Sequence, residues 1–146
     1  MGLHEDILLF RTRLNAAIDD AMQTDVAEAA KQRLADTAQE LVYDAYEPAF
    51  HDRWYDDGGL LDTTENVMET HYNPADLELE IVDNPPWHDW DDEITAGIPL
   101  TEAVEKGVLR GGAGPRPFVA EAEHRFAASG EFEAALTAGL RRNGMI

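Results

Sequence analysis

The first third of the chain repeats apolar residues at the three- and four-residue spacing of an amphipathic helix. One stripe lies within about His4–Met22, and Glu5 and Asp6 stand at the end where the helix dipole favours negative charge. A second stripe lies within Val26–Tyr46. We therefore predict N-terminal helices over residues 4–47. The apolar positions are Ile7, Phe10, Leu14, Ala17 or Ile18, and Ala21 in the first stripe, and Val26, Ala30, Leu34, Ala38, Leu41 and Ala45 in the second.

The link between these two predicted helices is short. Thr24 or Asp25 is placed to cap the second helix, and Glu28 completes a box-like pattern with Asp25. Pro48 is expected to end the helix, because its ring removes a donor and clashes with the preceding turn. Only a few residues around Gln23 separate the two stripes, so both an antiparallel pair and one kinked rod fit the pattern.

Residues 48–83 are predicted to be a loop followed by a β-hairpin. Leu77–Ile81 alternates strictly between apolar and acidic residues, which indicates a strand with an acidic face towards solvent and an apolar face inward. A weaker strand is predicted over Asn66–Tyr72. Asn73–Asp76 lies between them and has the composition of a tight turn.

After the hairpin, the pattern predicts an acidic, aromatic loop and then more helices. Two terminal helices are expected over about Pro117–Ala128 and Gly130–Arg142. Ser129 is predicted as a cap, and Gly144 as the stop of the last helix.

A chain of 146 residues suits one domain. The predicted fold class is α+β: long N-terminal helices, a small antiparallel hairpin too small to stand alone, and C-terminal helices packed on it. The parts of this single domain, residues 1–146, are N-terminal helices at 4–47, loop and hairpin at 48–83, an aromatic acidic loop at 84–97 and a C-terminal helical part at 98–146.

The composition is strongly acidic, with a formal net charge of −19, and only Lys31 and Lys106 among the 11 basic residues are lysines. Such a surface repels phosphates, so we predict no specific binding to nucleic acid and no membrane attachment. Three interpretations of the charge stay open: an ordinary acidic protein, adaptation to high salt, and mimicry of nucleic acid. Scarce lysine beside abundant aspartate favours high salt, where screening weakens self-repulsion, and gives a halophilic host as a hypothesis.

The sequence offers no recognisable reaction chemistry. Cysteine is absent, which excludes disulfides, thiolate zinc sites and cysteine nucleophiles. The five histidines stand singly, Ser129 lacks a Gly-x-Ser-x-Gly context, and Asp56–Gly59 lacks the alternating oxygens of a calcium loop. We predict no catalytic, cofactor-binding or metal-binding residues, no cofactor and no enzymatic activity. No long apolar run or secretory pattern is present, so we expect a soluble, untargeted protein.

Eight residues are predicted to contact other protein molecules. Four of them, Trp54, Tyr55, Trp87 and Trp90, are aromatic residues in acidic loops, and rigid aromatics are enriched at protein interfaces. Pro115 and Pro117 stiffen the backbone around Arg116, just before a helix. The alternative is that these side chains fold back onto their own chain. The eight are Trp54, Tyr55, Leu60, Trp87, Trp90, Arg116, Pro117 and Phe118.

Three short motifs resemble those of minor tail, or tail-completion, proteins of tailed phages. Val42–Pro48 is similar to the Tyr-rich helix end of that family, and Arg53–Asp62 is similar to its arginine…Gly-Gly-Leu-Leu loop. Arg116–Val119 and the following helix are similar to its Arg-Pro-Phe element. The similarity covers about Val42 to Gly144, and the chain departs from the family in its acidity and in the tryptophan-rich Trp87–Glu93.

The resemblance implies a non-enzymatic structural protein of the virion. Such proteins assemble as rings, commonly of six copies, at the head–tail junction and join the tail tube to the connector while DNA passes through. The expected partners are copies of this chain and other neck and tail proteins, and the expected location is the virion, after assembly in the host cytoplasm. The alternative is an acidic inhibitor or immunity protein that binds a cationic toxin or nuclease.

Overall fold

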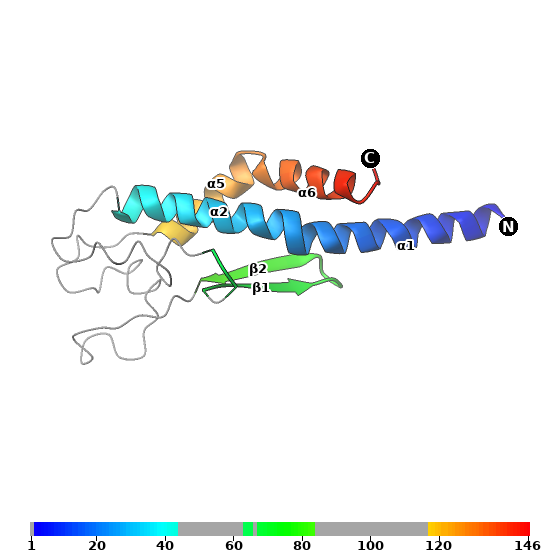
Figure 1. Ribbon diagram of the computed structural model, residues 1–146, viewed down its shortest axis with the longest axis horizontal. Coiled ribbons are helices and arrows are strands. Elements are labelled where there is room, and N and C mark those ends of the chain that lie inside the picture. Colours follow the sequence, from blue (N-terminus) through cyan, green and yellow to red (C-terminus); the bar gives the residue numbers. More distant parts are fainter. Residues whose placement is uncertain (1, 44–62, 66, 84–116) are drawn as a thin grey trace.

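A computed structural model describes residues 2–43, 63–65, 67–83 and 117–146. One helical rod forms its long axis, a hairpin lies along one side of the rod, and two C-terminal helices fold back along another side (Figure 1). This arrangement confirms the predicted α+β class. The elements are α1 (Leu3–Ala21), η1 (Met22–Val26), α2 (Ala27–Ala38), η2 (Gln39–Tyr43), β1 (Met68–Asn73), β2 (Glu78–Asp83), α5 (Phe118–Ala128) and α6 (Glu131–Arg142).

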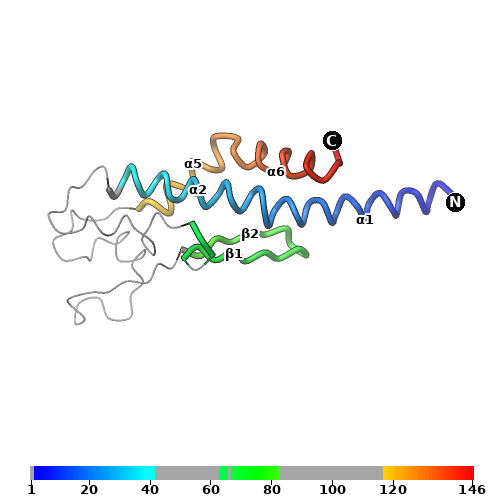
Figure 2. The backbone as a smooth tube through the Cα atoms, in the orientation of Figure 1, coloured from blue at the N-terminus to red at the C-terminus, as the bar shows by residue number. Residues whose placement is uncertain are grey.

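The rod is continuous from Leu3 to Tyr43, which decides for one rod over an antiparallel pair (Figure 2). Residues 3–43 contain neither glycine nor proline, so nothing in the sequence forces a break. The predicted cap at Thr24 or Asp25 is wrong, because both lie inside the π-helical turn η1 between residues of helical conformation. Asp25 instead accepts a hydrogen bond from the Arg142 guanidinium of α6, at 2.8 Å.

The hairpin pairs β1 and β2 in antiparallel register, from Met68 opposite Asp83 to Asn73 opposite Glu78. The predicted alternation is confirmed, since Glu78 and Glu80 are exposed while Leu79 and Ile81 are half-buried.

Leu77 differs from its predicted place in the second strand. It has a φ of 52° and lies in the turn, with 54% of its surface exposed. The Asn73 side chain accepts a hydrogen bond from the Ala75 amide, which lies two residues further on. That local bond helps to hold the turn, and the second strand begins at Glu78.

The main core lies where the rod meets the start of β1 and the helix α5. Phe118 and Met68 are fully buried there, and Leu41, Ile81 and Val119 pack around them. The buried members of this cluster are Leu34, Ala35, Ala38, Val67, Met68, Phe118 and Ala122.

The joint between α5 and α6 agrees with the predicted boundaries. Gly130 adopts a φ of 80°, a conformation that favours glycine, and the Ser129 hydroxyl accepts a hydrogen bond from the Glu131 amide at 3.3 Å. Gly144, with a φ of 74°, follows the last turn of α6 as predicted.

A very close helix contact holds α6 against the rod. A Cβ placed on Gly139 would lie only 2.9 Å from the Ala21 Cα and closer still to the Ala21 Cβ. Gly139 and Ala21 are therefore the small residues that allow the two backbones to approach.

Gly139→Ala is expected to destabilise the fold by about 1–3 kcal/mol, because the added methyl group forces α6 away from the rod. Alanine has a higher helix propensity than glycine, so helix propensity alone predicts that the substitution increases stability. Urea unfolding measures the difference, and the exposed Thr137→Ala on the same helix is the control. A Gly139→Ala protein as stable as wild type would contradict the close contact.

An ion pair joins the segment just before β1 to the rod. The buried Lys31 donates to the Glu65 carboxylate at 2.5 Å, and the Thr70 amide and hydroxyl donate to the same carboxylate. Together they lower the pKa of Glu65 to about 2, with the Lys31 hydrogen bond as the largest cause.

The stabilisation from Glu65 is expected to depend on pH. A lowered pKa means that the contribution is complete above the ordinary pKa of 4.5 and is lost as the pH falls towards about 2. Glu65→Gln should therefore reduce stability at pH 7 and lose less stability than wild type between pH 5 and pH 2. Thermal unfolding between pH 2 and pH 7 measures these stabilities, and Glu28→Gln at an exposed position is the control. If the stability of Glu65→Gln fell with pH as steeply as that of wild type, the Glu65 carboxylate would not be the stabilising group.

Candidate functional site

Six of the eight predicted contact residues lie outside the described residues: Trp54, Tyr55, Leu60, Trp87, Trp90 and Arg116. Pro117 is exposed and forms the N-cap of α5. Phe118 contradicts the prediction of an exposed anchor, since its side chain is fully buried in the core of its own chain. Phe118 and Ala122 stand four residues apart on one face of α5, and this helical spacing of apolar residues indicates that both are buried.

The largest exposed apolar feature of the described chain is the N-terminal end of the rod. Residues 3–16, called the arm below, extend past the hairpin and past α6 (Figure 1). Every arm residue is exposed except Leu14, which is half-buried. The exposed fractions are 77% for Leu3, 54% for Ile7, 47% for Leu8, 44% for Leu9 and 58% for Phe10.

The arm carries a regular apolar seam that continues into the folded body. Leu3, Ile7, Phe10 and Leu14 alternate at spacings of four and three residues, which places them along one side of the helix. The same spacing continues to Ala17 and Ala21, which are buried. In the described chain the seam is therefore covered at its C-terminal end and uncovered along the arm.

The arm differs in charge from the rest of this acidic chain. Two arginines, Arg11 and Arg13, balance its two acidic residues, Glu5 and Asp6. The described ion pairs of the chain engage the other basic side chains of the rod, whereas within the described ranges neither Arg11 nor Arg13 has an acidic partner. Two arginines are thus available beside an uncovered apolar seam.

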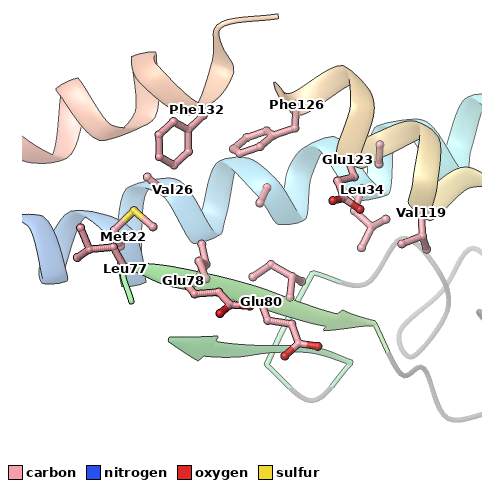
Figure 3. A pocket seen from close by; sticks show the side chains of 14 residues that line it. Met22, Val26, Leu34, Leu77, Glu78, Glu80, Val119, Glu123, Phe126 and Phe132 are labelled. Carbon is pink, nitrogen blue, oxygen red and sulfur yellow. The ribbon is translucent and has the colours of Figure 1, made fainter. Parts of the chain in front are cut away.

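A groove of about 680 Å³ opens between the rod, β2 and the α5–α6 pair (Figure 3). Met22, Val26 and Leu34 form its floor on the rod and are buried. Phe126 and Phe132 stand on the α5–α6 side, with ring centroids 6.3 Å apart in an edge-to-face arrangement. The remaining apolar lining residues are Ala30, Leu77, Leu79, Ile81, Val119 and Ala122.

Acidic side chains edge this apolar groove. Glu78 and Glu80 lie on β2 and Glu123 lies on α5, and all three are exposed (Figure 3). Within the described ranges they form no ion pair with a basic residue of the chain. The groove therefore presents an apolar floor and a negative rim, which is the lining expected for an apolar partner that carries positive charge.

The described residues give no sign of a metal centre or a membrane span. No group of three histidine, aspartate or glutamate side chains comes together among them. No helix in the described ranges is long and apolar enough to cross a membrane.

Comparison with known proteins identifies a family that this chain resembles. A family model described as YomN matches residues 9–142, which include most of the arm and all lining residues of the groove. No curated protein and no solved structure matches the chain.

Two phenylalanines, the buried Phe118 and the exposed Phe10, test the distinction between the core and the arm. Phe118→Ala should destabilise the chain by about 3–5 kcal/mol, because it leaves a cavity in the core. Phe10→Ala, on the exposed arm, should change stability by less than about 0.5 kcal/mol. Urea unfolding followed by circular dichroism, at a concentration where the chain is monomeric, gives both values. Equal losses would show that the arm packs on its own chain.

Proposed function

The chain belongs to the YomN family, and we propose that it is a structural subunit of the head–tail junction of a tailed virus. In this proposal copies of the chain close into a ring, which joins the tail tube to the connector and lets DNA pass. The motifs shared with tail-completion proteins support the location, and the exposed arm supports assembly.

The observation that carries the proposal is the uncovered apolar seam. Leu3, Ile7 and Phe10 each expose more than half of their surface, in a row on one stiff helix. A contiguous apolar surface of this kind marks a contact site, because covering it removes apolar area from water. A subunit built for assembly needs such a surface, whereas an enzyme needs converging reactive groups.

The acidity of the chain fits a ring through which DNA moves. A net charge of −19 repels phosphate groups. A lumen lined by carboxylates gains nothing from counterion release, so DNA slides past it without binding. The arginines of the arm are then used in contacts between proteins.

The proposal is tested with the purified full chain and one pair of arm variants. Wild type should form a closed oligomer of fixed mass in light scattering and rings in electron micrographs. Ile7→Asp combined with Phe10→Asp should give folded monomers, because both changes place charge on the seam. Thr12→Asp combined with Asn15→Asp adds the same charge to the arm away from the seam and should assemble as wild type does.

In a virus whose genome carries this gene, the seam variant should leave filled heads and free tails unattached, while the control variant gives infectious particles. Two results would overturn the proposed function. One is a wild-type chain that stays monomeric at all concentrations and salt levels, as the inhibitor alternative predicts. The other is a normal yield of infectious particles from the seam variant.

A further inference from the structure

We infer that the arm of one copy docks into the groove of the next copy, a contact that rests on the proposed ring function. Each copy would then use two different surfaces: its arm binds the next copy, and its groove binds the arm of the copy before it. Such head-to-tail contacts generate a ring when the rotation between copies closes. The partner that fits the groove is thus a second copy of this chain.

The dimensions of the two surfaces agree. At about 1.5 Å per residue, the seam from Leu3 to Leu14 is about 17 Å long. The groove floor on the rod, from Met22 to Leu34, is about 18 Å long by the same rise. An amphipathic helix that lies in an apolar groove uses side chains at the spacings that this seam shows.

The charges of the two surfaces are complementary. With about 100° per residue, Arg11 lies about 70° to one side of the seam and Arg13 about 90° to the other. A helix seated on its seam would therefore carry one arginine along each edge of the groove. There, Glu78 and Glu80 lie on the β2 edge and Glu123 on the α5 edge.

The arm cannot occupy the groove of its own chain. The arm and the groove floor belong to the same continuous rod (Figure 2), and the arm ends before Met22, the first floor residue of the groove. Folding the arm back would require a break near Met22, where the helix has no glycine or proline. The occupant must therefore come from another molecule.

Charge reversal tests the pairing without disturbing the core. The arm variant is Arg11→Glu with Arg13→Glu, and the groove variant is Glu80→Arg with Glu123→Arg; all four positions are exposed. Each variant alone should weaken self-association by at least about tenfold, because like charges then meet across the contact. Arg141→Glu, which makes half of the charge change of the arm variant, controls for added negative charge. Glu28→Arg with Glu133→Arg controls for added positive charge.

Mixing the two variants gives the decisive result. The glutamate arm fits the arginine groove and the arginine arm fits the glutamate groove, so an equimolar mixture should assemble although neither variant does alone. Analytical ultracentrifugation measures the assembly of the mixture. Low salt is used because salt screens the attraction between the charged side chains of the arm and the groove.

Each outcome has a separate meaning. Restored assembly in the mixture supports docking of the arm in the groove. A groove variant that assembles alone as well as wild type would overturn the docking and leave the ring function intact, since the copies would then associate through a surface other than the groove. A mixture that fails to assemble would also overturn the docking, whereas a monomeric wild type would overturn the ring function itself.

Discussion

The hairpin, α5 and α6 all pack on one unbroken helix that runs from Leu3 to Tyr43. The hairpin and α5 pack on its C-terminal half, and α6 packs beside its centre through the Gly139–Ala21 contact. Its first turns extend past all of these elements, and a straight helix cannot bend back to cover its own apolar seam. The same continuous helix therefore forms the floor of the groove and leaves the seam of the arm uncovered, so that another molecule can bind the seam.

Basic side chains are scarce in this chain, and most of the described ones attach other elements to the rod. Lys31 reaches Glu65 before β1, and Arg33 holds Glu131 at the start of α6. Arg125 of α5 reaches Glu40, and Arg142 of α6 reaches Asp20 and Asp25. These pairs join the rod to α5, to α6 and to the segment just before β1. In the part of the chain that the structure describes, the arginines of the arm are not used in this way, which agrees with a role between molecules.

Apolar periodicity predicted the helices, the hairpin and the fold class, because each element buries one regular face. Predictions from a few neighbouring residues were wrong at two places where contacts with distant parts of the chain are made. Thr24 and Asp25 have the composition of a cap, yet the helix continues and Asp25 pairs with Arg142, more than a hundred residues away. Pro115 and Pro117 stiffen the backbone before Phe118, which was therefore predicted to contact other molecules, but packing against the rod buries its side chain. The groove could not be predicted, because its lining comes from the rod, β2, α5 and α6, which only the folded topology brings together.

Disulfide trapping between copies tests whether the arm of one copy lies in the groove of another, and the chain has no cysteine of its own that would interfere. One copy carries Asp6→Cys, at the edge of the seam, and the other carries a cysteine in place of Glu78, Glu80 or Glu123 on the groove rim. We predict that the mixed copies form covalent dimers under mild oxidation at one or more rim positions, while each copy alone stays largely uncrosslinked. Efficient crosslinking of the Asp6→Cys copies with themselves, and none with any rim position, would contradict the account.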